Sequence, residues 1–159
     1  MKKTLLFFLF GLLNLSISAS VAEPIQVAAN LAFDADISRK ENKPIIFFIT
    51  ADHCPYCEKL RQEYFNFSTD DERFILRELE LDNYHSVVGF DGRKSNHHVL
   101  ADRYGISLTP TVAFVGPNGE ELAGAIVGLL TMDFYNYYFE KALDESISQL
   151  QSTALAQAK

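Results

Sequence analysis

Two cysteines, Cys54 and Cys57, are the only cysteines of this chain, and Pro55 and Tyr56 separate them. The spacing is compatible with a reactive dithiol, half of a metal site or an inert structural disulfide. An apolar run precedes the pair and a helix-favouring stretch follows it, so we expect Cys54 at a helix N-terminus. Unpaired N–H groups there stabilise the thiolate, which is the reactive form of cysteine. We predict that Cys54 attacks a substrate disulfide and that Cys57 resolves the mixed disulfide.

The metal alternative requires further ligands beside the two cysteines. The sequence offers four histidines, His53, His85, His97 and His98. No second C-x-x-C and no H-x-x-x-H pairing follows, which favours redox chemistry over metal binding. A structural staple is disfavoured as well, because so short a loop removes little chain entropy. We therefore expect no metal and no cofactor at the pair.

The N-terminus has the pattern of a secretory signal peptide. Lys2 and Lys3 precede an apolar run, and Ser20-Val21-Ala22 fits a small-x-small cleavage pattern. We predict a signal peptide over residues 1–22 with cleavage before Glu23. An uncleaved membrane anchor is the alternative, although the apolar core is short against the roughly 20 residues that span a bilayer. No cysteine lies near the cut, which excludes a lipoprotein.

The exported chain would contain 137 of the 159 residues, enough for one compact domain. Loss of Lys2 and Lys3 changes the net charge from −7 to −9. This acidic balance argues against nucleic acid and against anionic lipid as partners. Hydrophobic residues make up 48% of the sequence, so the domain can form a core that needs no disulfide to hold it.

Apolar periodicity and turn residues predict an α/β sandwich around a mixed central sheet. Within it, Glu78 falls on an alternating strand. The final helix is expected to turn Phe134, Tyr138, Leu143 and Ile147 towards the core. The expected helices cover residues 26–40, 58–67, a short stretch from 69, 95–104 and a long segment after 131. The expected strands cover 45–50, 75–81, 111–115 and 121–127, with a loop over 82–94 and a flexible tail over 152–159.

The apolar strand before Cys54-Pro55-Tyr56-Cys57, together with Thr109-Pro110 before a hairpin, resembles the thioredoxin fold over residues 23–151. The downstream half resembles exported SoxW-type thioredoxins, whose pattern it follows in order. The matching segments are Phe90-Asp91-Gly92, Leu100-Ala101-Asp102-Arg103-Tyr104-Gly105, Thr109-Pro110-Thr111, Pro117-Asn118-Gly119-Glu120 and Gly128.

This resemblance implies a thiol–disulfide oxidoreductase in which Pro110 is cis and faces the cysteines. Pro55, Tyr56, Thr109 and Pro110 would contact the substrate. The SoxW likeness implies a periplasmic reductase of disulfides in exported proteins, kept reduced by a membrane thiol-electron donor. We expect a monomer. Alternatives are a disulfide oxidase or isomerase, or a redox-inactive metal-binding or chaperone-like module.

The chain departs from the thioredoxin pattern around the cysteines. His53 replaces the usual Trp, and Phe48 occupies the position of a buried Asp. The Pro-Tyr dipeptide is typical of glutaredoxins, but no glutathione-binding signature follows. His53 is either a cation that stabilises the thiolate or an exposed rim residue. Glu78 is a candidate proton carrier for Cys57, although strand alternation favours a solvent-exposed charge.

Overall fold

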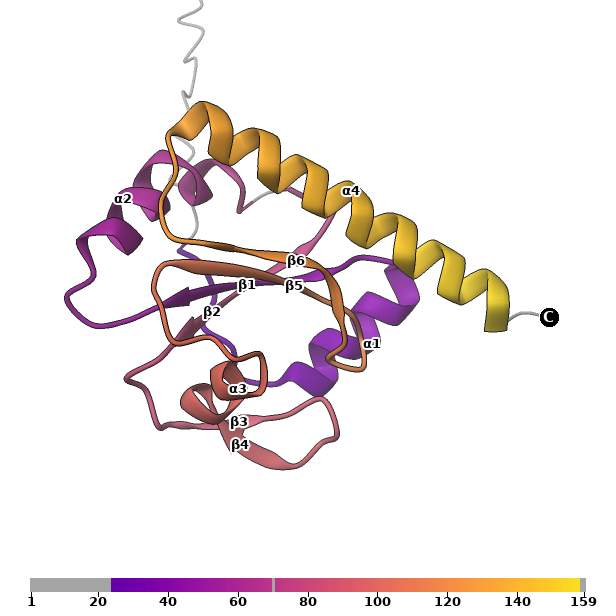
Figure 1. The fold of residues 1–159 in the computed structure, drawn as a ribbon. Coiled ribbons are helices and arrows are strands. Elements are labelled where there is room, and N and C mark those ends of the chain that lie inside the picture. Colours follow the sequence, from indigo (N-terminus) through magenta and orange to yellow (C-terminus); the bar gives the residue numbers. More distant parts are fainter. Residues whose placement is uncertain (1–23, 70, 158–159) are drawn as a thin grey trace, which may run out of the picture.

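The computed structural model describes residues 24–69 and 71–157, and the predicted signal peptide lies outside them. These residues form a mixed sheet with helices on both faces (Figure 1). The helices are α1 (Leu31–Glu41), α2 (Pro55–Glu63), α3 (His97–Arg103) and α4 (Met132–Gln157), with a 3₁₀ turn, η1 (Phe65–Phe67). The strands are β1 (Ile45–Thr50), β2 (Ile75–Glu80), β3 (Ser86–Val88), β4 (Lys94–Asn96), β5 (Thr111–Val115) and β6 (Glu121–Val127).

The strand β1 is the centre of the sheet and is buried along its whole length. The strand order is β2-β1-β5-β6, with β1 parallel to β2 and antiparallel to β5. A continuous apolar run suits such a position, because both faces of the strand are covered. The predicted strand over 45–50 and the predicted mixed sheet are therefore confirmed.

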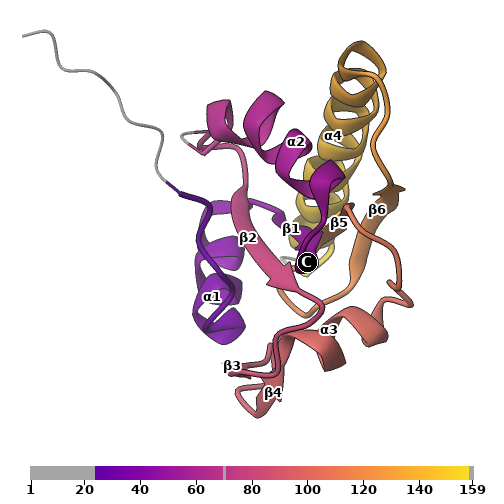
Figure 2. The same cartoon turned by 90° about the vertical axis from the view of Figure 1, so that its left-hand side faces the viewer.

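Alternate residues of β1 enter two separate cores. Ile45, Phe47 and Ile49 pack with residues of α1 and α3. Ile46 and Phe48 pack on the other face with residues of α2 and α4. The two views agree with this division, with α1 and α3 on one side of the sheet and α2 and α4 on the other (Figures 1 and 2). The helix that carries the cysteines is thus seated on the Phe48 face.

The first helix begins later than the sequence predicts. Residues 24–30 are not helical but run alongside β2, where the Glu78 N–H donates to the Gln26 carbonyl and the Ala28 N–H donates to the Glu78 carbonyl, both at 2.9 Å. The helix α1 starts after Asn30, whose side chain accepts a hydrogen bond from the Phe33 N–H. The predicted start at residue 26 is wrong because strand pairing with β2 competes with the helix there.

Two further local predictions fail in the segment between the cysteine helix and α3. The short helix predicted from residue 69 does not form over residues 71–74. Asp71 instead accepts a hydrogen bond from the Arg73 N–H in a tight turn. Residues 82–94 are not wholly a loop, because β3 pairs antiparallel with β4 around the turn at Gly89–Gly92. The strands β2, β5 and β6 lie close to their predicted ranges.

The long helix α4 buries only part of the face that the sequence predicts, since Leu143 is buried and Ile147 is partly buried against the same core. Tyr135 and Phe139 are buried, whereas Phe134 and Tyr138 are exposed. Residues 152–157 continue α4, and the side chains of residues 152–156 are exposed. Among the described residues, no helix is both long enough and apolar enough to cross a membrane.

A buried ion pair joins α1 to the sheet and provides a test of the fold. The Asp34 carboxylate contacts the Arg77 guanidinium of β2 at 2.6 Å, and both side chains are largely buried. Asp34→Asn leaves the guanidinium without its counter-charge, so we expect a loss of about 3 kcal/mol in unfolding free energy. Urea denaturation measures it. The matched control is Asp36→Asn, which removes an exposed pair with Arg39 and should leave the midpoint nearly unchanged. Equal losses in both variants would contradict this account.

Candidate redox site

The two cysteines form a disulfide at the start of α2. Their sulfur atoms are bonded at 2.01 Å. Cys54 is the N-cap of the helix, and its sulfur accepts a hydrogen bond from the Cys57 N–H at 3.1 Å. Pro55 occupies the first helical turn, where its missing N–H costs nothing. Cys54 is half-buried and Cys57 is only 3% exposed. The predicted position of Cys54 at a helix N-terminus is confirmed.

A short, constrained loop connects β1 to this helix. The Asp52 N–H donates to the Asp82 carboxylate at 2.9 Å, which ties the loop to the segment after β2. His53 has a φ of 56°, a left-handed conformation that few residues other than glycine adopt readily. The chain therefore turns sharply just before Cys54. His53 is exposed at the rim of the site, and whether its charge acts on the thiolate stays a prediction.

The loop before β5 lies against the Cys54 sulfur. The Thr109–Pro110 bond is cis, as the resemblance implied. The Thr109 hydroxyl lies 3.5 Å from the Cys54 sulfur, within hydrogen-bond range for sulfur. The Gly128 N–H donates to the Pro110 carbonyl at 2.8 Å and fixes this loop to the end of β6. Tyr56 is 63% exposed at the start of α2, so its side chain is accessible to a partner.

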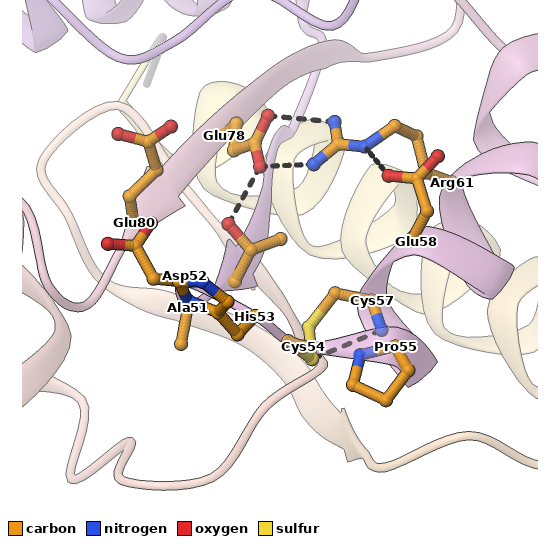
Figure 3. Close-up of a pocket in the computed structure, with 11 residues that line it drawn as sticks. Ala51, Asp52, His53, Cys54, Pro55, Cys57, Glu58, Arg61, Glu78 and Glu80 are labelled. Carbon is orange, nitrogen blue, oxygen red and sulfur yellow. Dashed lines mark hydrogen bonds and ion pairs between the residues drawn. A yellow bond between two sulfur atoms is a disulfide. The ribbon is translucent and has the colours of Figure 1, made fainter.

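A pocket of ≈ 620 Å³ adjoins the disulfide and contains both cysteines in its wall (Figure 3). Glu78 of β2 reaches this pocket and is only 5% exposed. Its carboxylate accepts a hydrogen bond from the Thr50 hydroxyl at 2.7 Å and from Arg61 at 2.5 and 2.8 Å. The sequence interpretation that favoured a solvent-exposed Glu78 is therefore wrong. Strand alternation misleads here because an arginine from α2 covers the carboxylate.

The sequence analysis missed Arg61. It lies four residues after Cys57 on α2, and its guanidinium is 5.2 Å from the centre of the Phe48 ring. Hydrogen bonding to Glu78 raises the pKa of Arg61, so the guanidinium is always charged. The i, i+4 spacing from Cys57 could have indicated that both side chains lie on one helix face. Nothing in the local sequence indicated that Glu78 would meet it.

His97 and His98 lie outside the pocket of the cysteines, whereas His53 lines it. His97 is buried elsewhere, where its Nδ1 accepts from the Glu80 N–H at 3.2 Å and its Nε2 lies 2.9 Å from the Ala28 carbonyl. His98, on α3, contacts Asp102 of the same helix and the carbonyl of Leu81, just after β2. In the part of the chain that the structure describes, no three side chains of metal-ligand type converge.

Comparison with known proteins gives one family match. The model of the thioredoxin-like domain family matches residues 32–143. A search of curated proteins finds no match to the sequence.

Similar solved structures agree with the fold. The DsbH oxidoreductase is 20% identical with a TM-score of 0.55, covering 82% of this chain and 93% of that chain. Thioredoxin f from spinach chloroplast is 17% identical with a TM-score of 0.52, covering 81% and 98%. A mutant thioredoxin from Halobacterium salinarum is 22% identical with a TM-score of 0.52, covering 79% and 96%. At these identities the likeness shows the fold.

The unequal burial of the two sulfur atoms predicts unequal reactivity. In the reduced protein, we expect iodoacetamide to label Cys54 at least about tenfold faster than Cys57, because only Cys54 is both accessible and at the helix end. Brief alkylation followed by peptide mass spectrometry measures the ratio. Protein unfolded in urea is the control and should label both cysteines equally. Faster labelling of Cys57 in the folded protein would reverse the assigned roles.

Proposed function

This chain belongs to the thioredoxin-like domain family, and from that premise we propose that it is an exported thiol–disulfide oxidoreductase that reduces disulfides in periplasmic proteins. The observation that carries the proposal is the Cys54–Cys57 disulfide at the N-terminus of α2, with Thr109 in contact with the Cys54 sulfur. The position of this disulfide at a helix end, beside the Thr109–Pro110 loop, supports exchange with a partner disulfide.

The geometry supports a two-step exchange. In the reduced protein, the Cys54 thiolate attacks one sulfur of a client disulfide, and the departing client sulfur takes up a proton. The Cys57 thiol then loses its proton and attacks Cys54, which restores the Cys54–Cys57 bond and releases the second client thiol. Two electrons pass from this protein to the client. The helix N-terminus stabilises the Cys54 thiolate in the first step.

Client binding is assigned to the surface around the disulfide. Exposed Tyr56, next to Pro55, forms one side of this surface. The Thr109–Pro110 loop, in which Thr109 is half-buried and Pro110 is buried, forms the other. A client segment lying between them would bring its disulfide to Cys54. The clients are disulfide-containing exported proteins, and the protein works on them as a monomer.

The reducing direction rests on the likeness to exported SoxW-type thioredoxins. In this proposal, residues 1–22 direct export, and a membrane thiol-electron donor returns the disulfide to the dithiol after each cycle. The Pro-Tyr dipeptide and His53 favour the thiolate, which stabilises the reduced form and makes the couple more oxidising. A donor that keeps the protein reduced would still allow it to act as a reductase.

A trapping experiment tests the order of attack. Cys57→Ala leaves no thiol to resolve the mixed disulfide, so we expect it to accumulate covalent complexes with clients or donor in the exported compartment. Non-reducing gel electrophoresis with mass spectrometry detects them. Cys54→Ala is the matched control and should trap few or none. Trapping by Cys54→Ala alone would contradict the assignment, and trapping by neither variant would contradict exchange with proteins.

The redox state in cells tests the direction. We expect most of the protein to carry free thiols when cells are acid-quenched and their thiols are alkylated at once. Removal of the membrane donor should convert the pool to the disulfide. A pool that is mostly disulfide in the presence of the donor would identify an oxidant. Stoichiometric metal in the purified protein, lost on Cys54→Ser, would instead favour a metal-binding module.

A further inference from the structure

The ion pair between Arg61 and Glu78 lies in the wall of the pocket that contains the two cysteines. Arg61 comes from the cysteine helix, and Glu78 comes from β2, where it is paired in register with Phe48 of β1. The pair therefore links the element that carries the reactive sulfur atoms to the sheet beneath it. Thr50, at the end of β1, donates to the same carboxylate.

Hydrogen bonds and an aromatic ring position the guanidinium of Arg61. The guanidinium donates two hydrogen bonds to the buried Glu78 carboxylate, and its Nε contacts Glu58 at 3.3 Å. The Phe48 ring covers one face of the guanidinium. Because Glu78 is buried and Arg61 is only partly exposed, a charge here is screened less than a charge on the surface.

The charges of the pocket do not balance. Its wall contains four carboxylates, from Asp52, Glu58, Glu78 and Glu80, against the single guanidinium of Arg61. Anionic neighbours disfavour a thiolate, and a cationic neighbour favours it. Arg61 is thus the one cationic side chain, among the described residues of this wall, that opposes the carboxylates whenever Cys54 or Cys57 becomes a thiolate. His53, at the rim, is neutral unless protonated.

We propose that Arg61 and Glu78 form a charge-compensated positioning pair that sets the thiol–disulfide equilibrium of Cys54 and Cys57, with the two residues acting in opposite directions. The inference rests on the redox function proposed above and adds the residues that tune it. Neither residue touches a client. Glu78 limits the effect of the guanidinium on the thiolate, and Arg61 limits the effect of the carboxylate.

Opposite signs distinguish this role from a structural one. Loss of the Glu78 charge leaves Arg61 uncompensated, which stabilises the thiolate and the reduced protein. Loss of the Arg61 charge leaves the Glu78 carboxylate uncompensated, which destabilises the thiolate and the reduced protein. If the pair only held α2 against β2, the two losses would disturb the same contact and would shift the equilibrium in the same direction.

The experiment is equilibration of the full exported protein with glutathione buffers at pH 7. Glutathione disulfide takes two electrons from the Cys54–Cys57 dithiol, which becomes the disulfide, and two glutathione thiols are released. Glu78→Gln should lower the equilibrium constant for this oxidation, and Arg61→Gln should raise it, each by about threefold or more. The double variant, whose pocket has the wild-type net charge, should lie between them.

Charge-conserving variants and a distant ion pair are the controls. Arg61→Lys and Glu78→Asp should stay closer to the wild-type constant than the neutral variants do. Arg73→Gln and Glu140→Gln break an ion pair between the turn before β2 and α4, outside the cysteine pocket. Neither should change the equilibrium constant for oxidation. If Arg61→Gln does not fold, Arg61→Met makes the same charge change.

The outcomes separate the role of Arg61 and Glu78 from the redox function itself. Opposite shifts from Glu78→Gln and Arg61→Gln support the inference. Shifts in the same direction, or none, with a wild-type protein that equilibrates normally, would overturn the inference and leave the redox function standing. A wild-type disulfide that does not exchange with glutathione would overturn the proposed function and the inference with it.

Discussion

The central strand β1 lies between a parallel neighbour, β2, and an antiparallel neighbour, β5, and this arrangement places both halves of the site. The chain leaves β1 at Thr50 and reaches Cys54 after a short loop, while it enters β5 directly from the Thr109–Pro110 loop. Because β1 and β5 are antiparallel, the C-terminal end of β1 and the N-terminal end of β5 lie at the same end of the sheet. The contact between the Thr109 hydroxyl and the Cys54 sulfur is the result.

The same strand also explains the unusual electrostatics beside the disulfide. Phe48, at the position where the thioredoxin pattern has a buried Asp, is apolar and packs under α2. The buried carboxylate beside the disulfide belongs to Glu78 on the neighbouring strand. Burial of that carboxylate requires a partner, because an unpaired buried charge is costly. The partner, Arg61, lies on the helix that carries the cysteines. The same interaction therefore neutralises the buried carboxylate and places a guanidinium in the wall of the cysteine pocket.

The parts of the molecule that local sequence determines were predictable. The buried run of β1, the position of Cys54 at a helix end and the β5–β6 hairpin each follow from residues close together in the chain. The parts decided by distant contacts were not. Residues 26–30 have a helical pattern, but residues 26–28 pair with β2 and residues 29 and 30 pair with β3. Glu78 has a surface pattern but meets Arg61 and Thr50. On α4, Tyr135 and Phe139 face the core in place of Phe134 and Tyr138.

The central claim is that the Cys54–Cys57 bond is a working redox couple and not a structural staple. Its reduction potential, measured by glutathione equilibration with quantification of the thiols at each buffer ratio, tests the claim most directly. The account predicts a value between those of cytosolic thioredoxin, about −270 mV, and the strongly oxidising exported oxidants, about −120 mV. A value below about −300 mV, in the range of structural disulfides, would contradict it.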